Sequence, residues 1–134
     1  MTMVFIDGQL LRNGRLESDM DMDNYQKQTT STAVYNTTSA IGANTAQLAY
    51  VVLGLAGEAG EVANKLKKVI RDGGGVITKE QRFALIDELG DVFWYLAQCC
   101  EKLDIDLSLV AMNNLNKLAE RKKNKTLQGS GDDR

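Results

Sequence analysis

The sequence predicts an all-α protein built as a bundle of four helices. Apolar residues recur at steps of three, four and seven along most of the chain, which is the period of amphipathic helices. Proline, which interrupts helices, is absent. The chain has 134 residues, enough for one domain with its own core and too few for two.

The helical pattern begins after residue 23. Residues 24–36 are polar and rich in threonine, so this first helix has a low intrinsic propensity and needs packing against the others. Residues 45–71 form the second helix, and a run of glycines at 73–75 ends it. Its apolar stripe is Leu48, Val51, Leu55, Val62, Leu66 and Val69.

Two further helices complete the domain. The third begins at Thr78, where Gln81 three residues later predicts a capping box. The fourth covers residues 106–123. We expect its inward side to consist of Leu107, Val110, Ala111, Leu115 and Leu118.

The two ends of the chain differ from the helical domain at residues 24–123. Residues 1–23 contain Asp7-Gly8 and Asn13-Gly14, which are turn signals of β-hairpins. They fit a short N-terminal β-arm or a loose extension equally well. Residues 124–134 are rich in glycine and polar residues and are expected to form a loop.

Composition excludes several classes of function. Sixteen basic and eighteen acidic residues give a net charge of −2, unlike a basic nucleic-acid binder, so no nucleic-acid partner is expected. Histidine is absent, which excludes a Ser-His-Asp triad and a histidine-ligated zinc. Without a membrane-length apolar stretch or a signal-peptide pattern, we expect a cytoplasmic protein with no membrane partner. The adjacent Cys99 and Cys100 are expected to be buried and reduced.

Four acids carry the strongest chemical signal. Glu58 and Glu61 lie three residues apart in the second helix, and Glu88 and Asp91 do so in the third, so each pair shares a helix face. Only Glu61 has a cation four residues away on its own helix, at Lys65. Facing helices would therefore gather like charges that need a cation. Oxygen ligands without histidine or cysteine favour Mg²⁺, with Mn²⁺ as the second choice, over zinc. The alternative is a solvated acidic face.

Glycines surround these acids. Gly54, Gly57, Gly60 and Gly90 all fall inside predicted helices, where each costs about 1 kcal/mol relative to alanine. Close approach of two helices and space for a ligand both explain such a cost.

Basic residues supply a complement to the acids. A basic run, residues 65–71, follows the first acid pair, and Asn114, Lys117 and Arg121 share one face of the last helix. Carboxylates for a metal and cations for phosphate oxygens together make a phosphoanhydride site. A solvated helix face is the alternative for the cations. The aromatic residues at 94 and 95 fit either nucleotide contact or core packing.

Residues 53–62, LGLAGEAGEV, and residues 87–96, DELGDVFWYL, closely resemble MazG-like nucleoside triphosphate pyrophosphohydrolases of the all-α type. The shared signature is ExxE followed by ExxD, and the resemblance extends over about residues 24–134. It implies hydrolysis of (deoxy)nucleoside triphosphates to monophosphate and pyrophosphate, a housekeeping activity on the nucleotide pool. It implies that Mg²⁺ is held and catalysis is carried by Glu58, Glu61, Glu88 and Asp91. It implies contacts with the triphosphate or sugar from Lys68, Tyr95, Asn114, Lys117 and Arg121.

The resemblance also implies a homodimer or homotetramer with sites built between subunits. Apolar residues outside the main stripe of the second helix, at Val52, Ala59 and Ile70, independently predict a partner chain. Two other functions stay open. One is a phosphoribosyl-nucleotide pyrophosphohydrolase of the same fold, and the other is a non-catalytic helical regulatory bundle that binds metal structurally.

Overall fold

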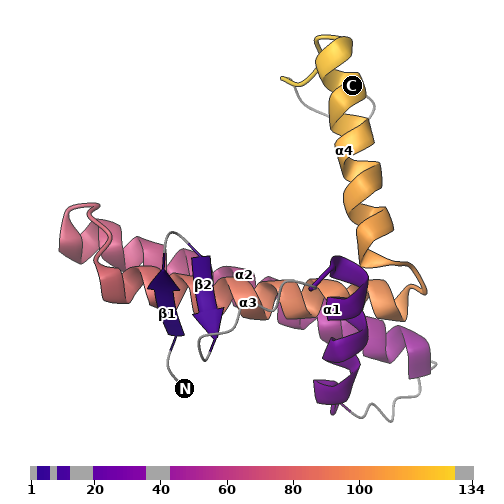
Figure 1. Cartoon of the computed structure of the whole chain (residues 1–134), viewed down its shortest axis with the longest axis horizontal. Coiled ribbons are helices and arrows are strands. Elements are labelled where there is room, and N and C mark those ends of the chain that lie inside the picture. The colour runs from indigo at the N-terminus through magenta and orange to yellow at the C-terminus, as the bar shows by residue number, and fades with distance from the viewer. Residues whose placement is uncertain (1–2, 7–8, 13–19, 36–42, 129–134) are drawn as a thin grey trace.

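Two long antiparallel helices form the main body of the protein (Figure 1). The computed structural model describes residues 3–6, 9–12, 20–35 and 43–128. Helix α2 covers Ala43–Gly73 and helix α3 covers Lys79–Lys102. The short helix α1, Met22–Thr29, lies against α3, and α4, Leu107–Lys123, follows α3 after a short connection. The predicted all-α domain with four helices is therefore confirmed in the described residues.

Part of the N-terminal segment, residues 1–23, falls outside the described residues. Within the described part, strand β1, Met3–Ile6, pairs antiparallel with strand β2, Gln9–Arg12. Val4 lies opposite Leu11 in this pair.

The turn between α2 and α3 follows the predicted signals. Gly74 and Gly75 have φ angles of +60° and +84°, a left-handed conformation that glycine adopts without a Cβ penalty. The Thr78 hydroxyl accepts the Gln81 backbone N–H at 3.2 Å, and the Gln81 side chain accepts the Thr78 N–H at 2.9 Å. The predicted capping box is thus present, and it sets the start of α3.

The first helix is shorter than predicted. Helix α1 ends at Thr29 and is followed by one 3₁₀ turn, Thr30–Thr32, whereas the sequence predicted a helix to residue 36. The hydroxyls of Thr29, Ser31 and Thr32 donate to carbonyls three residues earlier, at 2.7, 2.8 and 3.0 Å. Such local hydrogen bonds compete with helical ones and favour a tight final turn. Residue 36 itself lies outside the described residues.

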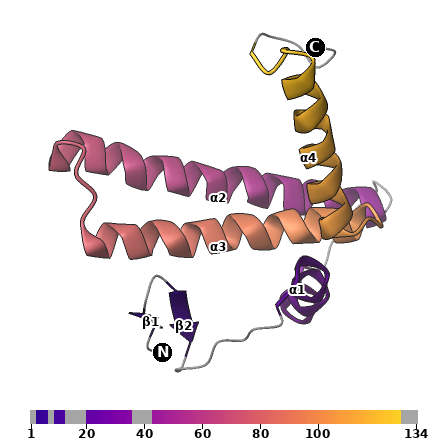
Figure 2. The same cartoon turned by 45° about the horizontal axis from the view of Figure 1, so that its top comes forward.

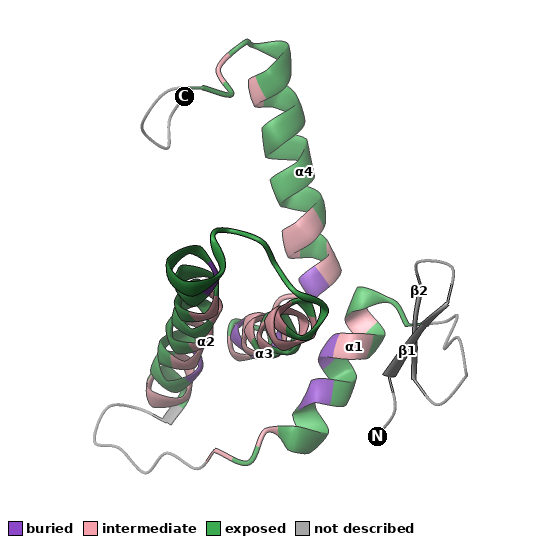
Figure 3. Cartoon of the chain, turned by 90° about the vertical axis from the view of Figure 1, so that its left-hand side faces the viewer, coloured by how far each residue is buried: buried purple, intermediate pink, exposed green. Residues whose placement is uncertain are grey.

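The core lies where α1, the second half of α3 and the start of α4 meet. Ala97, Cys100 and Leu107 are buried there, and Tyr25 and Phe93 pack against them with ring centroids 4.7 Å apart. Figure 3 shows buried positions on α1, on α3 and at the base of α4. Both cysteines are buried free thiols.

Hydrogen bonds from buried polar side chains join α1 to its neighbours. Gln98 on α3 is completely buried, donates to the Thr29 hydroxyl at 2.8 Å and accepts from the Tyr35 hydroxyl at 2.7 Å. Gln26 accepts the Leu107 N–H at 2.6 Å and donates to the Ile105 carbonyl at 3.1 Å. Side chains of α1 thus satisfy backbone groups at the start of α4 that would otherwise be unpaired.

Helix α4 corrects the expectation that the fourth helix turns its whole apolar side inward. It extends away from the α2–α3 pair in both views (Figures 1 and 2). Leu115 and Leu118, predicted to face inward, are 67% and 39% exposed. Asp23 contributes to this direction, because its carboxylate accepts the Ser108 N–H and hydroxyl at 3.1 and 2.9 Å.

No helix in the described part of the chain is both long and apolar enough to cross a membrane.

Candidate metal and phosphate site

Helices α2 and α3 bring three of the four predicted acids together. Glu58 comes from α2, and Glu88 and Asp91 come from α3. Each offers one carboxylate oxygen, and these oxygens all lie within 4.8 Å of one another. Opposite ligands of Mg²⁺ lie about 4.2 Å apart, because each Mg–O distance is about 2.1 Å. Small side-chain movements would therefore place all three oxygens around one ion. We call these residues the acidic triad.

Burial and neighbouring negative charge raise the pKa of the Glu58 carboxyl above its usual value. Burial is the largest cause, followed by the nearby charges of Asp91 and Glu88. Both causes disfavour the ionised form, because burial removes water from the carboxylate and the neighbouring carboxylates repel its negative charge. A cation at the triad would remove this penalty.

Glu61 does not join the triad. It lies one turn after Glu58 on α2, and its side chain is exposed. Its charge still adds a smaller contribution to the raised pKa of Glu58. The structure therefore places Glu61 beside the triad rather than in it.

Lys65 pairs across the helix interface. Its Nζ lies 3.1 Å from Oε1 of Glu88, with side chains 34% and 18% exposed. The sequence had indicated Lys65 as a possible partner of Glu61 on the same helix. One signal could have indicated the observed pairing, because Lys65 follows Glu58 by seven residues, two helical turns, and so shares its face.

Tyr95 explains one of the four glycines. A Cβ added at Gly54 would overlap three atoms of the Tyr95 ring, so the ring lies directly on the backbone of α2. A Cβ at Gly57, Gly60 or Gly90 would meet no atom within 4 Å in the described structure. Close approach therefore accounts for Gly54 alone, and the other three face open space.

The position of Tyr95 places its hydroxyl at the edge of the triad. Burial raises the pKa of this phenol, and the neighbouring Tyr50 and Glu58 raise it further. Tyr35 in turn stacks on Tyr50 with ring centroids 5.0 Å apart. Tyr95 thus interacts with both Tyr50 and the Glu58 carboxylate.

Trp94 has a structural role that the sequence left open. Its indole N–H donates to the Thr32 hydroxyl at 2.8 Å, and its ring meets Tyr95 edge-on with centroids 5.0 Å apart. These contacts fasten the 3₁₀ turn after α1 to α3.

A cavity of about 220 Å³ lies between α2 and α3, next to the Lys65–Glu88 ion pair. Its lining includes both Lys65, the partner of Glu88, and Lys68. Lys68 is exposed, one turn along α2 from Lys65. The predicted phosphate-binding Lys68 therefore lines the same cavity as Lys65, the partner of Glu88. The remaining lining residues are Val69, Gln81, Ala84 and Leu85.

Residues 47–126 match the family model described as the MazG nucleotide pyrophosphohydrolase domain. This chain belongs to that family. Both acid motifs and the cavity lie inside the matched segment. The chain is also 50% identical over 119 residues to "Gene 37 protein" of Mycobacterium phage L5. The aligned segment covers 86% of this chain and the whole of the phage protein. No solved structure matches this chain.

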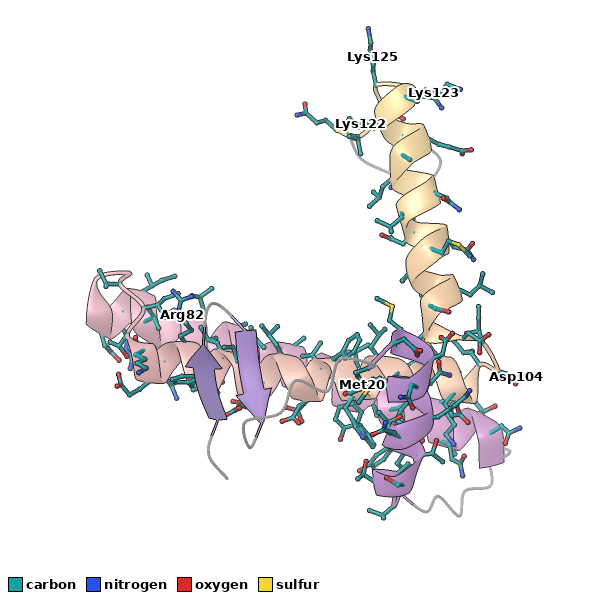
Figure 4. The ribbon with its side chains drawn as sticks, viewed as in Figure 1. Met20, Arg82, Asp104, Lys122, Lys123 and Lys125 are labelled. Carbon is teal, nitrogen blue, oxygen red and sulfur yellow. The ribbon has the colours of Figure 1, made fainter. Side chains whose placement is uncertain are left out.

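The α4 residues of this MazG domain lie apart from its acids. Asn114 and Lys117 are exposed and Arg121 is half-buried on a helix that leads away from the α2–α3 pair. Figure 4 shows side chains spread around α4, with Lys122 and Lys123 near its far end. Within one chain the predicted substrate-binding residues thus form two groups, one at the triad and one on α4.

Proposed function

We propose that this protein hydrolyses nucleoside or deoxynucleoside triphosphates to the monophosphate and pyrophosphate, with Mg²⁺ or Mn²⁺ as the metal. Membership of the MazG family supports pyrophosphohydrolase activity in general. The observation that carries the more specific proposal is the acidic triad, whose oxygens lie within 4.8 Å of one another inside that domain.

The triad has the chemistry that a hard divalent cation requires. Its donors are carboxylate oxygens, and neither histidine nor a cysteine lies among them. A cation bound there would polarise a phosphate group and lower the pKa of a water molecule. A triad with only three ligands would leave positions for substrate oxygens, which is how Mg²⁺ is usually bound beside phosphates.

The other residues of the site would orient the substrate and move a proton. A carboxylate oxygen that does not hold the cation would accept the proton of the attacking water. Lys68 would contact phosphate oxygens from the cavity next to the Lys65–Glu88 ion pair. Glu61, one turn from Glu58 and exposed, would complete the set of four acids by turning its side chain inward.

We propose that a second copy of the chain brings an α4 helix to the triad. Asn114, Lys117 and Arg121 cannot serve the triad of their own chain while α4 extends away from it. Large apolar side chains are exposed on both α2 and α4, as expected of surfaces that pack in an oligomer. They include Leu53 at 73% and Leu115 at 67% exposure. A homodimer or homotetramer would cover them, and sedimentation that shows a monomer at micromolar concentration would contradict this.

A nucleotide screen tests the proposed function. The four common ribonucleoside and four common deoxyribonucleoside triphosphates are incubated with the protein and Mg²⁺, and released pyrophosphate is measured. We expect turnover of at least one of them. Glu88→Gln should lower turnover by about a hundredfold or more, because it removes a charge from the metal site.

Glu80→Gln is the matched control. Glu80 lies on the same helix, in its first turn and outside the triad, so the same chemical change there should leave turnover intact. Full activity of Glu88→Gln, or equal losses in both variants, would contradict the assignment. Metal binding without any turnover would instead indicate a regulatory bundle.

A further inference from the structure

The Lys65–Glu88 ion pair has no place in the steps described so far. Its ammonium comes from α2 and reaches a carboxylate of α3 at 3.1 Å. Glu88 is at the same time one of the three acids whose oxygens lie within 4.8 Å of one another. One carboxylate therefore belongs both to an ion pair and to the candidate metal site.

Without a metal, the acidic triad brings three negative charges close together. Lys65 is the cation that the described structure places in an ion pair with this group. Removing one partner of a half-buried ion pair leaves the other charge uncompensated, and here two like charges are already beside it.

We propose that Lys65 is a positioning residue that supplies this missing positive charge, and that its ammonium competes with the divalent cation for Glu88. The inference rests on the proposed function, since it takes the triad as the metal site. In the metal-free protein Lys65 would hold Glu88 toward Glu58 and Asp91 despite their repulsion. When a divalent cation binds, its larger charge would displace the ammonium from Glu88.

The structure offers a place for the displaced ammonium. Lys65 lines the cavity of about 220 Å³ that Lys68 also lines. A lysine side chain has a flexible four-carbon stem, so it can leave a carboxylate and turn into such a space without backbone movement. Two ammonium groups there would meet the phosphate oxygens of an incoming substrate.

Replacement of Lys65 tests whether its charge competes with the metal ion for Glu88 or whether its side chain only packs against α3. Lys65→Met removes the charge and keeps the length of the side chain, and Lys65→Gln also removes the charge but keeps a hydrogen-bond donor. Lys65→Arg keeps the charge. Lys67→Met is the matched control, because Lys67 lies on the same helix and donates to Asn64 at 2.7 Å on the exposed surface.

Two readouts are measured on the full chain without nucleotide. The first is the melting temperature of the metal-free protein. The second is Mn²⁺ affinity, from the electron paramagnetic resonance signal of the free ion at a temperature where every variant is folded. We expect Lys65→Met and Lys65→Gln to melt at a lower temperature without metal, yet to bind Mn²⁺ about three- to tenfold more tightly, because a positive charge beside the ion is gone. Lys65→Arg and Lys67→Met should resemble the wild type.

Unchanged or weaker Mn²⁺ binding in both charge-removing variants would overturn the inference. It would do so while leaving the proposed metal site intact, provided that the wild type binds the ion. If the wild type itself binds no Mn²⁺, the metal site of the proposed function fails, and the inference fails with it.

Discussion

Replacing Gly54 by alanine should destabilise the protein through a single contact. Alanine inside a helix is favoured over glycine by about 1 kcal/mol. At Gly54, however, the new methyl group would overlap Cε1, Cζ and Cδ1 of the Tyr95 ring. Forcing extra volume into a packed contact costs about 1–3 kcal/mol. The net result should be a loss of up to about 2 kcal/mol, and the displaced ring should also disturb the neighbouring Glu58.

Gly57→Ala is the control one turn along the same helix. A Cβ at Gly57 meets nothing within 4 Å in the described structure, so only the helix propensity applies there. This variant should gain about 1 kcal/mol. The difference between the two variants then measures the overlap with Tyr95, about 1–3 kcal/mol.

Urea unfolding of the metal-free protein at one fixed concentration measures these values. A double variant, Gly54→Ala with Tyr95→Ala, tests the cause, since removing the ring should relieve the overlap and give a coupling energy of similar size. The reasoning is refuted if Gly54→Ala is as stable as Gly57→Ala, or if the two changes in the double variant are simply additive.

Three further predictions follow from other parts of the structure. Gln26→Ala should lower the free energy of unfolding by about 1–3 kcal/mol, because it leaves the buried Leu107 N–H unpaired; no change on urea unfolding would contradict this. Because the pKa of Glu58 is raised in the folded protein, the contribution of this carboxyl to the stability of the metal-free protein is largest when it is protonated, and it is lost as the pH rises from the usual pKa through the raised one. Glu58→Gln should remove that part of the dependence in unfolding measured from pH 4 to 7 with chelator, and an identical profile would refute it. Lys117→Ala and Arg121→Ala should each lower kcat/KM, because each removes about 2–4 kcal/mol of transition-state stabilisation. Unchanged kcat/KM in both variants would show that α4 does not belong to the site.

Helix positions could be predicted where local signals were strong. Helices α3 and α4 begin directly after Thr78 and Asp106, the positions at which the sequence placed their starts. The capping box and the turn glycines are short-range features that depend on few neighbours. The predicted end of α1 was wrong, because the hydroxyl of Thr29 and the hydroxyls that follow it compete with backbone N–H groups for the backbone carbonyls. Helix propensity alone does not show which hydrogen bonds form.

The site could be predicted only in part. Spacing along α3 predicted that Glu88 and Asp91 lie on one helix face, and the structure brings both near Glu58 of α2. Spacing along α2 predicted Glu61 beside Glu58, but Glu61 lies outside the triad. The Lys65–Glu88 pair was missed, because counting four residues along one helix says nothing of the register between two helices. Amphipathic spacing indicated that Leu115 packs against another element, but it could not show whether that element belongs to the same chain or to a second copy.

The direction of α4 depends on tertiary hydrogen bonds. Asp23 and Gln26 of α1 bind the first residues of α4, more than eighty positions away in the sequence. No periodic pattern encodes such a contact, so the sequence predicted an inward-facing fourth helix where α4 instead extends away from the α2–α3 pair.

Phosphorus NMR of a nucleotide digest tests the central claim most directly. A deoxynucleoside triphosphate that the screen identifies as a substrate is incubated with the protein and Mg²⁺, and the products are followed over time. The proposed function predicts resonances of the monophosphate and of pyrophosphate in equal amounts, and none above background with Glu88→Gln. Nucleoside diphosphate with orthophosphate would show cleavage of the other phosphoanhydride bond and would contradict the account.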